Sequence, residues 1–197
     1  KNNVPPNGIK INDSTYIDET ELSILDWNEY YFWNLKMFGE EIAKQKCNIN
    51  EKLYASSDTT KIYGGYIKRM YFIHIKYQTY PMVGISFQQA IEYCKWRTDR
   101  VYEIALIKNK ILTAPVNTDA AHIFTVEGFL NGTFKCTIKN SSRLKEIPIY
   151  QFQLPSLQNF EMAEQDAYAK YLKSKKTSVP FPEEKAKNIL MIDVHAN

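Results

Sequence analysis

The sequence predicts an α+β domain in which three helices pack around a small, irregular antiparallel sheet. Apolar residues recur at helical spacing in three separate segments, near residues 23–38, 87–98 and 156–172. Residues 66–77 are instead rich in β-branched and aromatic side chains that alternate along two faces, which is typical of a strand. With 197 residues, of which 44% are hydrophobic, the chain can enclose a core as a single domain.

The N-terminal part is expected to begin with an arm and then form a strand and a helix. Residues 1–13 start with a polar, proline-rich run and are expected to be an arm or tether, followed by one domain over 14–197. A short strand is expected at 14–17. Ser23 is a typical N-cap residue, Asp26 lies in the first helical turn, and Gly39 ends the apolar pattern.

The rest of the domain has two further helix starts. Ser86 and Gln89 form a capping-box pattern before the helix at 87–98, and Ser156 begins the helix that runs to about 172. Between them, residues 101–150 show a weak pattern and are expected to form a divergent insertion of short strands and loops. Residues 189–194 are expected to be the last strand.

Composition excludes several functions and the motifs supply no catalytic centre. A formal charge of +3 is too dilute for a nucleic-acid binder, and no run of residues is apolar for long enough to span a membrane. Cys47, Cys94 and Cys136 can form at most one disulfide, which the sequence leaves open. The histidines are isolated and no phosphate-binding loop is present, so no catalytic, cofactor-binding or metal-binding residue is assigned and no cofactor is expected.

Three segments carry a family resemblance. They are YIDETELS at 16–23, YPMVGISFQQAIEYCKW at 80–96 and QLPSLQNFEMA at 153–163. In this order they resemble motifs of the formylglycine-generating enzyme family, also called the sulfatase-modifying-factor domain, whose fold is a variant of the C-type lectin fold. The continuation WRTDRV at 96–101 is similar to the branch that includes the Gld-type gliding-motility lipoproteins of type IX secretion in Bacteroidota.

The resemblance implies a function without catalysis. Oxidase members of the family need a pair of redox cysteines that bind copper and a C-terminal Arg-Gly-Gly-Ser-Trp segment, and this sequence contains neither. We therefore expect a non-catalytic, exported scaffold or accessory subunit of a bacterial cell-envelope complex for secretion, gliding or outer-membrane assembly. A glycan- or peptide-binding lectin-like module is the alternative, and a fragment of an active formylglycine-generating-type oxidase is the second alternative.

The same resemblance leads to expectations about partners and location. We expect protein partners, with no nucleic acid and no small-molecule substrate, and a location in the periplasm or at the outer-membrane surface. A lipidated cysteine preceding Lys1 would anchor the chain to the outer membrane. Residues 99–150 are expected to supply the face that a partner covers.

The helix motifs also predict which side chains are buried. A set of six large or motif residues is expected inside, and Phe87→Ala is expected to cost about 3–5 kcal/mol. The six are Trp27, Phe87, Ile91, Cys94, Trp96 and Phe160.

Overall fold

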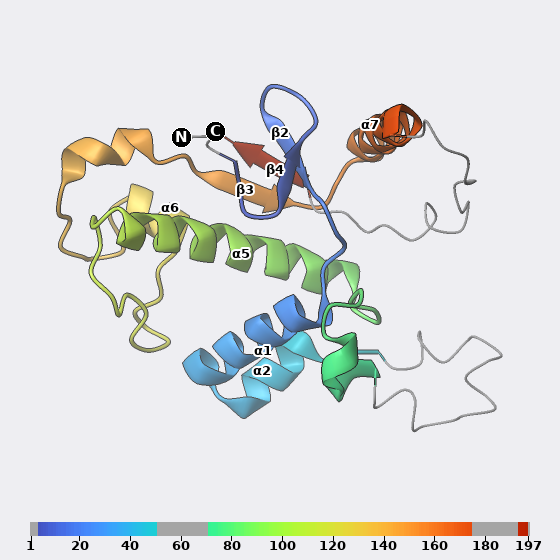
Figure 1. The fold of residues 1–197 in the computed structure, drawn as a ribbon. Helices are drawn as coiled ribbons and strands as arrows, with labels where there is room; N and C mark the ends of the chain where they lie inside the picture. Colours follow the sequence, from blue (N-terminus) through green and yellow to red (C-terminus); the bar gives the residue numbers. More distant parts are fainter. Residues whose placement is uncertain (1–3, 51–70, 175–192, 197) are drawn as a thin grey trace.

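A four-stranded antiparallel sheet and one long helix organise the protein (Figure 1), and the α+β class is confirmed. The computed structural model describes residues 4–50, 71–174 and 193–196. The strands have the order β1-β2-β4-β3, and Ile9 pairs with Ile17 while Val194 pairs with both Tyr16 and Phe152. The strands are β1 Gly8–Lys10, β2 Thr15–Asp18, β3 Tyr150–Gln153 and β4 Asp193–Ala196.

The first helix agrees with its sequence signals. Helix α1 spans Ile24–Phe38, and the Ser23 hydroxyl accepts the Asp26 N–H at 3.1 Å while the Asp26 carboxylate accepts the Ser23 N–H at 3.1 Å. Gly39 ends the helix with φ of 85°. Helix α2, Glu40–Cys47, follows directly and was not expected, because eight residues with few apolar positions carry little periodic signal.

The central helix is longer than expected. Helix α5 spans Phe87–Lys108, so residues 101–108 continue the helix instead of starting an insertion of strands and loops. Residues 101–149 contain no strand: they include the short helix α6, Val126–Leu130, and the 3₁₀ helix η2, Ser141–Glu146. In Figure 1, α5 lies between the sheet and the pair formed by α1 and α2.

The strand expected at 66–77 is wrong for its described part. Residues 71–73 are helical and Ile75–Tyr77 form the 3₁₀ helix η1, whereas residues 66–70 lie outside the described residues. The Tyr77 N–H donates to the His74 carbonyl at 2.9 Å, which closes a local turn. Tyr71 stacks on Tyr77, and Ile73 and Ile75 are exposed to solvent. The alternation of β-branched and aromatic residues in this segment therefore does not reflect a sheet.

The two ends of the sheet also refine the expectations. Strand β2 lies within one residue of the strand expected at 14–17, and β1 lies inside the segment expected as an arm. Helix α7 spans Leu157–Ser174, which confirms the third helix. The strand expected at 189–194 overlaps β4 at residues 193 and 194, and residues 189–192 lie outside the described residues.

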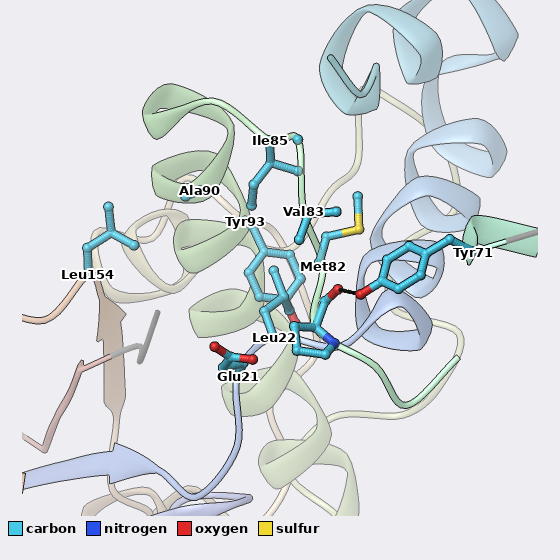
Figure 2. Close-up of a pocket in the computed structure, with 11 residues that line it drawn as sticks. Glu21, Leu22, Tyr71, Met82, Val83, Ile85, Ala90, Tyr93 and Leu154 are labelled. Atoms are coloured by element: carbon cyan, nitrogen blue, oxygen red, sulfur yellow. Dashed lines mark hydrogen bonds between the residues drawn. The ribbon is translucent and has the colours of Figure 1, made fainter. Parts of the chain in front are cut away.

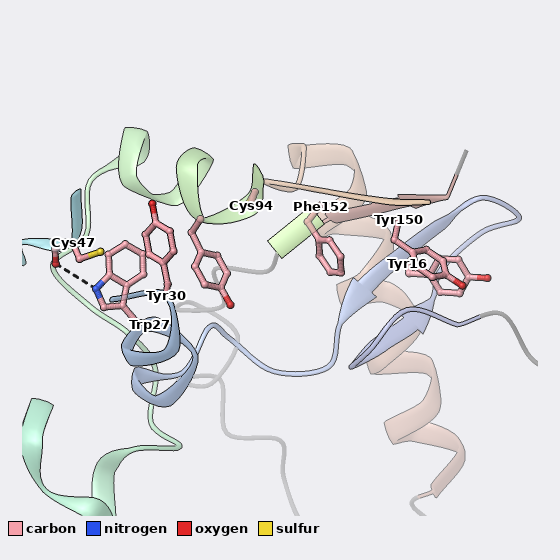
Figure 3. Close-up of a cluster of buried hydrophobic side chains, with 8 residues drawn as sticks. Tyr16, Trp27, Tyr30, Cys47, Cys94, Tyr150 and Phe152 are labelled. Carbon is pink, nitrogen blue, oxygen red and sulfur yellow. Dashed lines mark hydrogen bonds between the residues drawn. The ribbon is translucent and has the colours of Figure 1, made fainter. Parts of the chain in front are cut away.

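Two separate clusters of buried side chains support this arrangement. The first joins α1, α5 and the sheet through aromatic rings (Figure 3), and the second is built within residues 101–150 and the end of α5. The stretch that was expected to be an insertion therefore encloses its own core. The first cluster contains Tyr16, Trp27, Tyr30, Cys47, Tyr93, Cys94, Tyr150 and Phe152, and the second contains Tyr102, Leu106, Ile111, Leu112 and Phe124.

The expected core residues divide into three groups. Trp27 and Cys94 are buried, as expected, whereas Ile91, Trp96 and Phe160 are half-buried. Phe87 was expected inside and is 73% exposed, which is a correction. Phe87 is the first residue of α5, so it precedes Ala90, the first residue of the helix that is buried in the core. Because the ring is exposed, the large cost that was expected for Phe87→Ala no longer applies.

Candidate functional site: a cavity where three segments meet

An apolar cavity of about 480 Å³ lies where the three motif segments converge (Figure 2). The first segment contributes Glu21 and Leu22, and the third contributes Leu154. In Figure 2 the ring of Tyr93 lies between Leu154 on one side and Tyr71 on the other. The second motif and the turn before it contribute the remaining lining residues, which are Tyr71, Pro81, Met82, Val83, Gly84, Ile85, Ala90 and Tyr93.

Backbone hydrogen bonds hold these walls together. The Met82 N–H donates to the Leu22 carbonyl at 2.7 Å, and Ser23 and Pro81 form an antiparallel bridge. The Tyr71 hydroxyl donates to the Pro81 carbonyl at 2.7 Å. The walls are therefore positioned by contacts between segments that are far apart in the sequence.

Gly84 is required at the wall of the cavity. Its φ of 79° lies in the left-handed region, and the Gly84 carbonyl accepts the Asn50 N–H at 2.8 Å. A Cβ atom at this position would lie 2.7 Å from the side chain of Ile49 and 3.1 Å from the Asn50 carbonyl oxygen. Any other residue would push the strap at 81–85 away from the end of α2.

The cavity is suited to an apolar guest. Its walls are mainly aliphatic and aromatic carbon, and burial raises the pKa of the Tyr93 hydroxyl, which therefore stays protonated at neutral pH. Pockets that bind ligands combine such walls with a few polar groups. The ionisable side chains among the described lining residues are Glu21, Tyr71 and Tyr93, and the Tyr71 hydroxyl already donates to the Pro81 carbonyl.

Two large apolar side chains that are close in sequence to the cavity lining are exposed to solvent. Phe87, one turn before Ala90, is 73% exposed, and Leu157, three residues after Leu154, is 75% exposed. Large exposed apolar side chains are candidates for a surface that binds another molecule. Sequence analysis placed both residues in motifs but assigned neither to a site.

The cysteines are not activated. All three are free, with Cys47 and Cys94 buried and Cys136 exposed, so the disulfide that the sequence left open is not formed. Burial raises the pKa of Cys47 to about 11 and that of Cys94 to about 12, which keeps both as thiols. Within residues 4–50, 71–174 and 193–196, no group of three or more His, Cys, Asp or Glu side chains is arranged to hold a metal ion.

A second cleft, of about 380 Å³, shares Glu21, Leu22 and Tyr93 with the lining of the cavity. Arg97 forms an ion pair with Asp18 in its wall, and the Arg100 guanidinium lies 4.9 Å from the centre of the Trp33 ring. The indole N–H of Trp96 has no hydrogen-bond partner in this wall. Sequence analysis missed this cleft, although the spacing of residues 96, 97 and 100 on one helix was the available signal.

Comparisons with protein families, with curated proteins and with solved structures found no match to this chain. None of the helices in the described part combines the length and apolar character needed to cross a bilayer.

Proposed function

We propose that this protein is a non-catalytic scaffold or accessory subunit of a bacterial cell-envelope complex, with an architecture related to formylglycine-generating enzyme. The observation that carries the proposal is the apolar cavity, together with two exposed apolar side chains close in sequence to its lining, Phe87 and Leu157. A surface of this kind is suited to receiving an apolar anchor side chain from a partner protein.

The convergence of the motif segments supports the proposed family relationship. Residues that match the family motifs at 16–23, 80–96 and 153–163 all contribute to one cavity, although they are separated by long stretches of sequence. A chance resemblance in three places has no reason to bring them together in space. The capping boxes that these motifs predict at Ser23 and Ser86 are both formed.

The state of the thiols supports a role without oxidase chemistry. An oxidase of this family type would need a pair of reactive cysteines, and the raised pKa values of Cys47 and Cys94 oppose thiolate formation at both positions. Cys136 is exposed and lies outside both buried clusters. The same thiols fit simple packing roles.

The proposed docking face differs from the one first expected. Residues 99–150 were expected to supply the face that a partner covers, yet most of their large apolar side chains pack in or against the second buried cluster. Phe87 and Leu157 are close in sequence to the lining residues Ala90 and Leu154, and both are more exposed than any large apolar side chain of residues 99–150. We therefore place partner binding at Phe87 and Leu157.

Co-purification from native membranes tests the proposal. The variant Phe87→Asp/Leu157→Asp should lose the partners that the unchanged chain retains, because a carboxylate would have to be desolvated at the interface. Leu130→Asp is the matched control, since Leu130 is also exposed but lies on α6. Circular dichroism checks that each variant is folded. Retention of the same partners by the double variant would contradict the proposal.

The proposed location follows from the same family relationship. We propose that the protein acts in the periplasm or at the outer-membrane surface, anchored through a lipidated cysteine that precedes Lys1. Membrane fractionation together with metabolic labelling by palmitate tests this, and a soluble, unlabelled cytoplasmic protein would contradict it.

Glycan or peptide binding is a second candidate, favoured by the second cleft. Trp33 and Trp96 offer aromatic faces there, and Glu29 and Arg100 offer polar groups. Tryptophan fluorescence during titration with mannose, N-acetylglucosamine and a tetra-alanine peptide tests it, with Trp33→Ala as the variant. No change with any of the three probes would remove this candidate.

A further inference from the structure

The turn formed by residues 71–80, which we call the tyrosine turn, exposes two isoleucines close together in sequence. Ile73 is 69% exposed and Ile75 is 78% exposed, and Lys76 beside them is also exposed. The turn lies at the edge of the protein next to α1 and α2 (Figure 1). Branched aliphatic side chains are among the most often buried in soluble proteins, so two exposed on one short turn call for an explanation.

Three tyrosines accompany the isoleucines. The rings of Tyr71 and Tyr77 stack with their centres 5.8 Å apart, and Tyr80 lies edge-on to Tyr77 at 5.2 Å. The Lys76 ammonium lies 5.8 Å from the centre of the Tyr77 ring. Tyrosine and lysine both have an apolar body and a polar end, which suits them to the boundary between water and lipid.

The tyrosine turn is anchored to the fold. The Ile24 N–H donates to the Tyr80 carbonyl at 3.0 Å, and the Leu25 N–H donates to the Gln78 carbonyl at 2.8 Å. These N–H groups begin α1 and would otherwise lack partners within the helix. The apolar side chains are therefore presented by an ordered backbone, which lowers the entropic cost of binding.

The tyrosine turn itself carries no acidic side chain. Residues 71–91 contain no Asp or Glu and include the exposed Lys76, and Glu21 lies in the cavity wall that Tyr71 also lines. A pocket of about 280 Å³ beside Ile73 has Lys44 and no acidic residue among its described lining residues. A complementary surface would be both apolar and negatively charged.

We propose that the tyrosine turn binds the surface of an anionic lipid bilayer, with Ile73 and Ile75 inserted at the acyl boundary. The tyrosine rings then lie at the level of the headgroups, and Lys76 contacts the lipid phosphates. Burial in a protein interface would also account for the two exposed isoleucines. It would not account for the lack of acidic residues in the turn or for the tyrosines that flank the isoleucines. The two isoleucines do not line the cavity, although Tyr71 does, and the contact needs no covalent lipid.

Vesicle flotation of the purified chain, carrying no lipid modification, tests the proposal. One set of vesicles is phosphatidylcholine, and the other contains about 30% phosphatidylglycerol as the anionic lipid. The protein should float with the anionic vesicles, and the bound fraction should fall as salt is raised. Ile73→Asp/Ile75→Asp should lower the partition coefficient at least about tenfold, and Lys76→Glu should lower it several-fold on anionic vesicles only.

Two controls separate this contact from partner binding. Leu130→Asp changes an exposed apolar residue elsewhere and should float like the unchanged chain, and so should Phe87→Asp/Leu157→Asp. Near-ultraviolet circular dichroism establishes that each variant is folded. The proposal is overturned if the unchanged chain does not bind anionic vesicles, or if the Ile73/Ile75 variant binds as well as the Leu130 control.

Discussion

Replacing Arg97 with methionine removes one half of a buried ion pair that ties β2 to α5. The side chains of Arg97 and Asp18 are only 12% and 7% exposed, and Arg97 Nη2 lies 2.9 Å from Asp18 Oδ1. The guanidinium also donates to the Pro6 carbonyl at 3.2 Å and lies 4.1 Å from the centre of the Phe152 ring. Methionine retains much of the apolar packing but leaves the carboxylate without its cation.

The expected cost is large because the remaining charge stays buried. Removing one partner of a buried pair typically lowers the free energy of unfolding by about 3–5 kcal/mol. Burial already raises the pKa of Asp18, and Arg97 opposes that rise. Without Arg97, the pKa of Asp18 in the folded state rises further above that in the unfolded chain. The folded variant then binds a proton more readily, so its deficit is greatest at neutral pH and shrinks as the pH falls.

Urea unfolding at pH 7 and at pH 5, followed by circular dichroism, measures both effects. Lys95→Met is the matched control on the same helix, because Lys95 is 70% exposed and its nitrogen lies 4.0 Å from Glu92. This exposed pair should contribute less than about 1 kcal/mol. An Arg97→Met deficit no larger than that of the control, or one that grows at pH 5, would refute the reasoning.

Three further predictions concern burial. Phe87→Ala should change the free energy of unfolding by no more than about 0.5 kcal/mol in urea titrations, because the ring is mostly in solvent, and a loss above about 3 kcal/mol would contradict the observed exposure. Phe124→Ala, by contrast, should cost about 3–5 kcal/mol in the same assay, because that ring is fully buried in the second cluster, and a small loss would argue against this core. In the folded protein, Ellman's reagent should modify Cys136 alone, because burial protects Cys47 and Cys94 and raises the pKa of both thiols. Cys136→Ser should abolish this reaction, and rapid modification of a second thiol would disagree with the structure.

Helix starts were predictable from the sequence because the signals that set them are local. The hydroxyls of Ser23 and Ser86 each accept the N–H of the residue three positions later, and a side-chain oxygen of that later residue accepts the backbone N–H of the serine. Such a box needs only four consecutive residues. The end of α5 was not predictable in this way, because residues 101–108 remain helical through packing of Tyr102 and Leu106 on residues that follow much later.

The candidate site was only partly accessible to sequence reasoning. The segments that line the cavity were singled out by their resemblance to family motifs, but neither the cavity nor the exposure of Phe87 follows from a pattern of apolar spacing. Periodicity shows which side chains share a face of a helix, and it does not show how far the neighbouring elements extend along that face. Phe87 lies on the same face of α5 as buried residues, but it precedes the first turn of the helix that packs on the core.

The sequence by itself determined the α+β class, the starts of α1 and α5 and the position of β2, because caps and short-range periodicity operate over a few residues. Tertiary structure alone decided the conformation of residues 71–77, which alternate like a strand but fold as a turn. Their neighbours Gln78 and Tyr80 offer carbonyls to the first N–H groups of α1, a contact between segments about fifty residues apart. Hydrogen bonds between distant segments, and the burial of one segment under another, exist only in the assembled fold. Where they compete with the local preference for a strand, they override it.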